Sequence, residues 1–254
     1  MQQQTIRRPI EWVSASATHV GCVRKVNEDS LIALPDKQLW CVADGMGGYE
    51  AGDKASRMVT DSLSTCVLST RLDECAEQIE HQLHQANQTI MDYAQTLGHE
   101  PICGSTVCGL SIHGQVGLVF WAGDSRLYRV RRGEIEAVTR DHSQVEEWLQ
   151  QGYMTPQEAI NHPESHVITR AVGAYADFWL DMNIIDLHVG DRLILCTDGL
   201  YNTVGFEQFH KIMSTCLVEQ APEKLIQSSL SAGASDNVSV IVIEGCHAQS
   251  VNPL

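Results

Sequence analysis

Short apolar runs alternate with polar breaks along most of this chain. Runs rich in Val, Ile, Leu and Trp that are bounded by Gly, Asn or Asp are typical of strands. They cover residues 12–20, 31–34, 39–43, 106–113, 116–122, 127–130, 179–187, 192–196 and 238–243. The three runs between 106 and 130 are separated by breaks that contain glycine, which favours an antiparallel meander.

Apolar residues at helical spacing occupy the gaps between several of these strands. The spacing predicts two long helices over 51–67 and 76–97, and a later pair over 203–215 and 221–232. Pro222, near the start of the last helix, fits a first helical turn. Strands outnumber helices and often follow one another directly, so the pattern indicates an α+β fold in which helices cover antiparallel sheets.

One stretch departs from this pattern. Residues 141–176 are polar and only weakly periodic, with a short helix expected over 145–151 and a surface excursion after it. Insertions of this kind often serve as lids or binding loops. Because the chain contains no repeat, low-complexity tract or linker, we expect a single domain over 1–254.

Composition narrows the classes of function. Hydrophobic residues make up 43% of the chain, which is enough for a sizeable core. Against 17 Lys and Arg stand 32 Asp and Glu, which gives a net charge of -15. This excess argues against nucleic acid and against an anionic membrane as partners, and it suits a protein that holds cations.

The sequence also predicts a location for the protein. No stretch approaches the roughly 18 apolar residues of a membrane span, and the two arginines near the start are not followed by the apolar core of a secretory signal. The nine cysteines are scattered without a CxxC pair, and Cys41 and Cys196 lie inside apolar runs. We therefore expect a cytoplasmic protein with reduced thiols.

Four aspartates lie where apolar runs end or begin. Asp44, Asp124 and Asp198 each follow such a run, and Asp236 stands just before the run VSVIVI. If these strands share one rim, the carboxylates crowd together, which is costly unless a cation lies among them. A hard divalent ion with oxygen ligands would meet that need. The alternative is that each Asp is an ordinary turn residue, and spacing alone leaves both interpretations open.

Two shorter motifs add candidate ligands. The glycines of the DGMGG stretch would let the backbone approach a ligand, and the Gly45 carbonyl could itself coordinate an ion. The segment RKVNED contains Arg24, which alone would belong to a charged turn but beside a cation cluster could clamp two phosphate oxygens. The sequence lacks the GxxxxGK[ST], GxGxxG, HExxH and EF-hand signatures of other sites.

Taken in order, these motifs resemble those of the metal-dependent protein phosphatases of the PP2C type, the PPM family. Any one motif is weakly specific, but the ordered set is specific and spans most of the chain. The matching segments are RKVNED (24–29), VADGMGG (42–48), GST (104–106), AGDSRLY (122–128), RDHS (140–143), VITRAVG (167–173), CTDGL (196–200) and SDN (235–237). DGMGG in place of DGHGG, together with the compact length, resembles a stand-alone bacterial member.

The resemblance implies a fold and a metal centre. It implies a four-layer αββα sandwich, in which two antiparallel sheets lie face to face between helices, and two Mn²⁺ or Mg²⁺ ions at one end of the sheets. Asp44 resembles the carboxylate that bridges the two ions, and Gly45 would give its carbonyl to the second ion. Asp198 and Asp236 would hold the first ion, and residues 144–175 match the flap beside the site.

The remaining roles also follow from the resemblance. Asp124 resembles the ligand, shared with Asp198, of a third and weaker ion that bacterial members often bind. Asp29 and Glu28 would act through water on the metals, and Arg24 matches the phosphate-binding arginine. A water between the two ions would attack the phosphorus, so no Cys or Ser nucleophile is required.

The chain departs from the family pattern at two positions. Met46 stands where eukaryotic relatives carry His, and Tyr49 stands where many bacterial relatives carry His. The general acid for the leaving oxygen is therefore unassigned, and water could serve. His142 and His162 are candidates, although a structural role is the favoured interpretation for each.

The leading hypothesis is an enzyme that hydrolyses phosphoserine and phosphothreonine in proteins. It would act as a monomer on phosphoproteins and oppose a bacterial Ser/Thr kinase. The alternative is a phosphatase of small phosphoesters or of a partner-switching phosphoprotein, because the same metal centre would serve. A catalytically silent phosphoprotein-binding module is disfavoured, because Asp44, Asp198 and Asp236 are all present.

Overall fold

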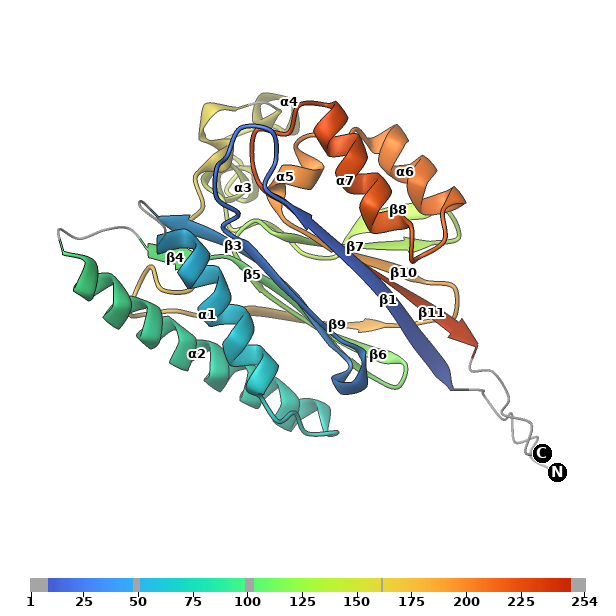
Figure 1. Cartoon of the computed structure of the whole chain (residues 1–254), viewed down its shortest axis with the longest axis horizontal. Coiled ribbons are helices and arrows are strands. Elements are labelled where there is room, and N and C mark those ends of the chain that lie inside the picture. Colours follow the sequence, from blue (N-terminus) through green and yellow to red (C-terminus); the bar gives the residue numbers. More distant parts are fainter. Residues whose placement is uncertain (1–8, 48–50, 99–102, 161, 248–254) are drawn as a thin grey trace.

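Two antiparallel β-sheets lie face to face, and helices cover the outer side of each sheet (Figure 1). The computed structural model describes residues 9–47, 51–98, 103–160 and 162–247. The layers follow the order helix, sheet, sheet, helix, so the α+β class and the four-layer sandwich are both confirmed. None of the described helices has the length and apolar character needed to cross a membrane.

The first sheet joins strands from the start, middle and end of the chain. Its strand order is β1-β11-β10-β7-β8, and every neighbouring pair is antiparallel. The strands are β1 (Ile10–His19), β11 (Val238–His247), β10 (Arg192–Cys196), β7 (Arg126–Arg131) and β8 (Glu134–Ala137).

The second sheet is built mainly from the first half of the chain. Its order is β2-β3-β5-β6-β9, again antiparallel throughout, and β4 pairs with the end of β3. The strands are β2 (Asp29–Leu34), β3 (Leu39–Gly47), β4 (Cys103–Ser105), β5 (Val107–His113), β6 (Val116–Ala122) and β9 (Asp181–Asp186).

Two pairs of long helices form the outer layers. Helices α1 (Ala51–Thr65) and α2 (Leu72–Leu97) cover the second sheet, whereas α6 (Phe206–Thr215) and α7 (Ala221–Ser231) cover the first (Figure 1). The shorter helical elements are η1 (Pro35–Lys37), α3 (Gln144–Gln150), α4 (Pro156–Ala159), η2 (Pro163–His166) and α5 (Asp198–Tyr201).

Alternation along the strands supplies three separate apolar layers. In β3, Cys41 packs toward α1 and α2, while Trp40 and Val42 pack between the sheets. In β11, Val240 packs toward the helices on the other side, while Ile241 packs between the sheets. Because both faces of these central strands are buried, their sequences are continuously apolar, which is why the runs were visible in the sequence.

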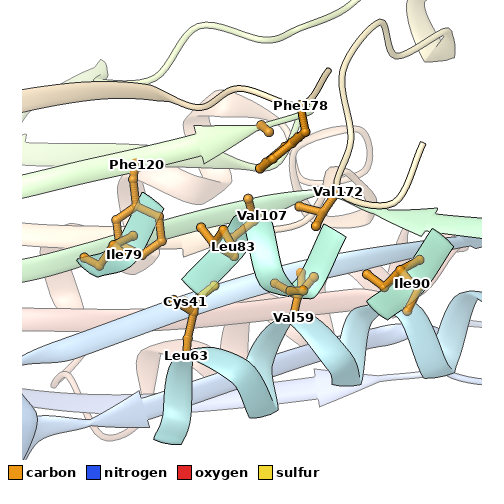
Figure 2. Packing of buried hydrophobic residues seen from close by; sticks show 14 of the residues in the cluster. Cys41, Val59, Leu63, Ile79, Leu83, Ile90, Val107, Phe120, Val172 and Phe178 are labelled. Carbon is orange, nitrogen blue, oxygen red and sulfur yellow. The ribbon is translucent and has the colours of Figure 1, made fainter. Parts of the chain in front are cut away.

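The layer beneath α1 and α2 anchors both helices on the second sheet. Leu63, Ile79, Leu83, Val107 and Phe120 are all fully buried there (Figure 2). Burying an apolar side chain of this kind contributes about 1.5–3 kcal/mol. This layer holds the start of α1 against the end of β3, and that junction forms part of the candidate site.

Most sequence-predicted elements are confirmed, and the differences have local causes. Strands β6 and β10 match the predicted ranges residue for residue. Strand β8 was missed because its sequence EIEA is a short, mostly exposed edge segment without an apolar run. The run predicted over 106–113 corresponds to β5, whereas the short strand β4 just before it was not predicted; Thr106 separates the two strands and bonds the Asp44 backbone. The single domain over 1–254 stays a prediction, because the residues at both ends lie outside the described ranges.

We expect Leu83→Ala to lower the free energy of unfolding by about 2–5 kcal/mol, because it removes a fully buried side chain and leaves a cavity. Urea denaturation followed by circular dichroism measures the change. The matched control is Glu80→Ala on the exposed side of the same helix, for which we expect a change within about 0.5 kcal/mol. Equal losses for both variants would contradict the assigned packing of α2.

Candidate functional site

A pocket of about 590 Å³ opens at one end of the two sheets. Its wall combines the end of β3, the turn between β6 and β7, the start of α5 and the turn before β11. The charged and titratable side chains along its described lining are Arg24, Glu28, Asp44, Asp124, His166, Asp198 and Asp236. The four aspartates that the sequence places beside apolar runs therefore meet around one cavity.

Asp29 and Asp44 are direct partners across β2 and β3. Residues directly opposite each other in an antiparallel pair have Cβ atoms about 4.5–5.5 Å apart. The Asp29 side chain is buried outside the pocket lining, where its Oδ2 accepts a hydrogen bond from Thr197 Oγ1 at 2.9 Å. Two ionised carboxylates at this spacing repel each other unless a proton or a cation compensates them.

Thr106 fixes the backbone that carries Asp44. The Asp44 N–H donates to Thr106 Oγ1 at 2.9 Å, and the Thr106 N–H donates to the Asp44 carbonyl at 2.8 Å. The Thr106 hydroxyl also lies 2.8 Å from Ser125 Oγ, next to Asp124 in the chain. This network links β3 to the turn that carries Asp124, so the two carboxylates are positioned together.

Gly45 and Gly52 allow β3 to approach the start of α1. A Cβ at Gly45 would lie 2.0 Å from the Gly52 carbonyl oxygen, closer than real Cβ atoms come. Glu28 binds both segments, because its backbone carbonyl accepts from the Gly45 N–H at 3.1 Å and its carboxylate accepts from the Gly52 backbone. A side chain at Gly45 would push these segments apart and displace its carbonyl, which is part of the pocket lining.

Asn237 anchors the turn that carries Asp236. Its side chain accepts from the Glu28 N–H at 2.7 Å and donates to the Val26 carbonyl at 3.0 Å. Its own N–H donates to Asp236 Oδ1 at 2.8 Å. Arg24 Nη2 donates to the other oxygen, Asp236 Oδ2, also at 2.8 Å. The RKVNED segment is thereby bound to the start of β11 at the pocket rim.

Asp198 is the first residue of α5, directly after β10 and Thr197. Its Oδ2 accepts from Asn202 Nδ2 at 3.2 Å, while its Oδ1 is buried without a hydrogen-bond partner. A Cβ at Gly199 would lie 1.9 Å from the Asn237 carbonyl oxygen. The glycine of the CTDGL motif therefore permits the close approach of α5 to the turn that carries Asp236.

Asp124 is held in the turn between β6 and β7 by an aromatic and ionic cluster. The Tyr201 hydroxyl donates to the Asp124 backbone carbonyl at 3.0 Å. The Arg126 guanidinium lies 3.6 Å from the centre of the Tyr201 ring and makes two hydrogen bonds to Asp141, at 2.8 and 2.7 Å. This cluster fixes the backbone, which leaves the Asp124 carboxylate directed by its turn toward the pocket lining.

Burial and mutual repulsion make these carboxylates hard to ionise. Burial, followed by the charges of neighbouring aspartates, raises the pKa of Asp44 well above its ordinary value. The same causes raise the pKa of Asp124 to about 7. Burial likewise raises the pKa of Asp29 to about 7. Burial first and Asp236 second raise the pKa of Asp198. A group of acids in this state favours a proton or a cation among them.

A hard divalent cation fits these residues. The lining offers carboxylate and carbonyl oxygens, which are the ligands that such ions take. Buried Oδ1 atoms of Asp29 and Asp198 have no hydrogen-bond partner. Within the described residues no three His, Cys, Asp or Glu side chains are already gathered as a metal cage. An ion here would therefore complete its coordination with further oxygens, such as water and the Gly45 carbonyl.

The two histidines named in the sequence analysis have structural partners outside this pocket. His142 is buried, stacks on Trp121, and accepts through Nδ1 from the Gly123 N–H at 3.1 Å. His162 accepts through Nδ1 from the Glu164 N–H at 3.2 Å. Neither belongs to the described lining, so the favoured structural interpretation agrees with their placement. Met46 lines the pocket, whereas Tyr49 lies outside the described residues.

The predicted flap region reaches the pocket near its end. Between residues 144 and 175 the structure contains α3, α4 and η2, and the helix predicted over 145–151 agrees with α3 to within a residue. His166 and Ile168 from this region contribute to the pocket lining. Side chains from this segment therefore face the same cavity as the aspartates.

Several residues of the described lining had no assigned role in the sequence analysis, among them Thr106, Asn237 and His166. Thr106 and Asn237 lie inside the GST and SDN motifs, so those motifs were the available signal. His166 carries no local signal, because only the fold of the flap region brings it to the pocket that Asp198 also lines. Contacts between distant segments decide such positions.

The raised pKa values of these acids predict how stability depends on pH in the absence of divalent ions. Asp29 and Asp124 have folded pKa values of about 7, above the unfolded value of about 3.9. The folded protein therefore binds more protons between these values, and its stability falls as pH rises through this window. We expect the melting temperature in EDTA to be lower at about pH 8 than at about pH 5.5. Each kcal/mol lost from the free energy of unfolding should lower the melting temperature by about 2–4 °C.

Scanning calorimetry in EDTA measures this slope. Asp44→Asn removes one of the repelling charges, so we expect the variant to show a smaller decrease than the unaltered protein. A melting temperature that rises over the same interval would contradict the electrostatic description of the pocket.

Comparison with known proteins shows to which family this chain is similar. Residues 23–231 match the family model described as protein phosphatase 2C. The chain is 33% identical over 236 residues to the serine/threonine phosphatase stp of Listeria innocua, which covers 89% of this chain and 93% of that protein. It is similar to PppA, a key regulatory component of T6SS in Pseudomonas aeruginosa, with a TM-score of 0.87, 36% identity, and coverage of 94% of this chain and 100% of that chain.

A second solved structure bears on the metal question. The catalytic domain of the serine/threonine phosphatase PstP, in complex with two manganese ions, has a TM-score of 0.82 and 28% identity to this chain. The match covers 93% of this chain and 99% of that one. Since both the family model and these relatives extend over most of its length, this chain belongs to the protein phosphatase 2C family.

Proposed function

We propose that this protein hydrolyses phosphoserine and phosphothreonine in proteins with the help of Mn²⁺ or Mg²⁺ in the aspartate pocket. The observation that carries the proposal is the set of Asp44, Asp124, Asp198 and Asp236 around one cavity, with repelling charges and an unpartnered buried oxygen. Family membership and relatives named as serine/threonine phosphatases support the same reaction.

The ligands can be assigned by combining the resemblance with the contacts. Asp44, at the centre of the carboxylate group, would bridge two ions, and the Gly45 carbonyl would serve the second. Asp198 and Asp236 would hold the first ion. Asp124 and Asp198 would hold a third and weaker ion. Asp29, the strand partner of Asp44, and Glu28 would act through water on the metals.

Bound divalent ions supply Lewis-acid activation of water near neutral pH and neutralise charge on the phosphate. The protein contributes position and charge around them. Thr106 holds the Asp44 backbone and Asn237 holds the Asp236 turn, so the carboxylates are fixed before substrate arrives. Because Gly45 and Gly199 have no side chain, the backbone segments that form the cavity wall pack closely against each other.

We propose that Arg24, which lies in the pocket lining, binds the phosphoryl group at the rim. Its side chain is 49% exposed and its guanidinium contacts Asp236 at the pocket rim, which supports this role. A planar guanidinium donates two parallel hydrogen bonds to a pair of phosphate oxygens. Met46 carries no exchangeable proton, so we assign protonation of the leaving oxygen to water in the pocket.

The biological setting follows from the same chemistry. A phosphoprotein substrate implies a Ser/Thr kinase whose action this enzyme opposes, and we propose that both act in the cytoplasm. We propose that the enzyme is a monomer and that residues 144–175 act as a flap beside the substrate. The name of PppA links that relative to a secretion system, and the same setting is one hypothesis for this protein.

We expect hydrolysis of a phosphothreonine peptide with Mn²⁺ or Mg²⁺ and none with EDTA. Asp198→Asn should abolish turnover and also the rise in melting temperature that Mn²⁺ gives the unaltered protein, because binding to the folded state stabilises it. Phosphate release and differential scanning fluorimetry measure the two effects. Asp61→Asn, on the exposed side of α1, is the matched control and should retain both.

Two outcomes would overturn this assignment. Turnover by Asp198→Asn at the rate of the control would remove this carboxylate from the metal centre. Metal-dependent hydrolysis of p-nitrophenyl phosphate, without any release from phosphopeptides, would favour the small-phosphoester alternative.

We expect Arg24→Ala to lower kcat/KM for a phosphothreonine peptide about 10- to 100-fold, which is the effect of one lost hydrogen-bonding partner to a charged group. The loss should appear with little change in Mn²⁺ affinity, because Arg24 contacts Asp236 without replacing it as a ligand. Steady-state kinetics and isothermal titration calorimetry with Mn²⁺ separate the two effects. Unchanged kinetics would exclude Arg24 from phosphate binding.

A further inference from the structure

A second cavity, of about 490 Å³, lies directly beside the aspartate pocket. The two cavities share Met46 and Ile168 in their linings. The second one, named here the side groove, lies between α2, the short strand β4 and the segment that follows η2. Its lining residues are Met46, Met91, Ala94, Gln95, Cys103, Ile168, Thr169, Arg170, Ala171, Gly173, Ala174 and Tyr175.

The wall of the side groove is fixed by hydrogen bonds. Ser105 in β4 and Val172 exchange two backbone hydrogen bonds, at 2.9 and 2.8 Å. Asn87 is buried in α2, where its Oδ1 accepts from the Gly173 N–H at 2.6 Å and its Nδ2 donates to the Tyr175 carbonyl at 3.0 Å. A buried amide with both ends satisfied holds one loop geometry, so the groove is formed before any ligand binds.

Gly173 shows how tightly this wall is seated on α2. Its φ of +90° lies in the region that glycine adopts most readily, and a Cβ there would lie 2.2 Å from Ile90 Cγ2. The wall therefore packs directly on a helix that belongs to the core of the protein. A ligand in the side groove would meet a rigid surface, which lowers the entropy lost on binding.

The chemistry of the side groove differs from that of the aspartate pocket. Its described lining contains one charged residue, Arg170, and no acidic one. Arg170 Nη1 already donates to Asp181 Oδ1 at 2.5 Å, and its guanidinium lies 4.7 Å from the centre of the Trp179 ring. With that charge engaged, the surface offered to a ligand is mainly methionine, alanine, isoleucine and aromatic carbon.

Exposed aromatic side chains extend this apolar surface toward solvent. Tyr175 is 64% exposed and Trp179 is 54% exposed, close together in the chain beside the groove. Large apolar groups gathered at one place on a surface mark sites where another molecule binds. The aspartate pocket next to them is strongly acidic, so the two cavities suit different groups of one ligand.

The position of Met46 relative to Asp44 suggests how an extended peptide could span both cavities. Asp44 and Met46 are two residues apart in β3, and a strand advances about 3.3 Å per residue. Two residues of an extended substrate cover the same distance of about 7 Å. A substrate that runs alongside β3 with its phosphoresidue at the aspartates would bring the side chain of a residue about two positions away to Met46 and the side groove.

We propose that the side groove binds an apolar side chain of the phosphoprotein substrate, about two residues from the phosphorylated one. This inference rests on the proposed function, because the phosphoresidue in the aspartate pocket fixes the register. Continuity through Met46 and Ile168 identifies the substrate itself as the occupant. The groove thus gives the enzyme a preference among phosphoproteins that the metal centre alone cannot supply.

The test uses a panel of phosphothreonine peptides that carry one leucine at successive positions in a serine and alanine background. We expect one leucine position to raise kcat/KM by about tenfold over the peptide without leucine, the usual effect of an apolar group in a pocket. Met91→Gln should remove this preference and leave kcat/KM for the leucine-free peptide and for p-nitrophenyl phosphate unchanged. Met91 lies in α2, outside the aspartate pocket.

Two further variants test whether any change at position 91, or any change in α2, has the same effect as Met91→Gln. Met91→Leu keeps an apolar side chain and should keep the leucine preference. Glu80→Gln, on the exposed side of α2 away from the groove, should behave like the unaltered protein. Melting temperatures of all variants verify that each is folded.

The outcomes separate the two levels of the proposal. If every peptide is hydrolysed with equal kcat/KM, or if Met91→Gln keeps the leucine preference, the side groove is not a substrate site while the proposed function stands. If no peptide is hydrolysed with Mn²⁺ present, the proposed function fails and this inference fails with it.

Discussion

Repulsion among buried carboxylates is the constraint on which the functional end of this protein depends. Asp29 and Asp44 face each other across two strands, and the buried Asp124 and the half-buried Asp198 lie near them. Burial and proximity both oppose their ionisation, so the arrangement costs free energy in the folded protein. A bound cation would offset this cost, because it favours the ionised form of the carboxylates. The electrostatics of the pocket therefore agree with metal dependence in this family.

The rest of the fold supplies the stability that this arrangement requires. Three apolar layers, rather than one, hold the two sheets between helices, and central strands such as β3 contribute to two of them. Hydrogen bonds from Thr106 and Asn237 then fix the backbone on either side of the acids. The acidic end of the sandwich is thus held by segments whose hydrogen bonds keep the carboxylates together.

The two cavities of this protein meet at Met46. Met46 replaces the histidine of eukaryotic relatives, and its side chain borders both the acidic pocket and the apolar side groove. At this junction the proposed catalytic pocket adjoins the groove that we propose selects among substrates.

The sequence by itself determined the class of fold, because strands buried on both faces must be apolar throughout and appear as runs such as 116–122 and 192–196. It also identified Asp44, Asp124, Asp198 and Asp236, because each borders such a run and lies in a family motif. It could not find the edge strand β8, whose exposed residues carry no apolar signal.

Only the tertiary structure decided which of these groups meet and what surrounds them. The pairing of Asp29 with Asp44, the hydrogen bonds of Asn87 to the 173–175 loop, and the place of His166 all join segments far apart in the chain. Local patterns of hydrophobicity report how each segment is buried, whereas contacts of this kind depend on how all the layers pack. The carboxylates proposed to bind metal could therefore be predicted from the sequence, whereas the shape of the pocket and of the side groove depends on the folded molecule.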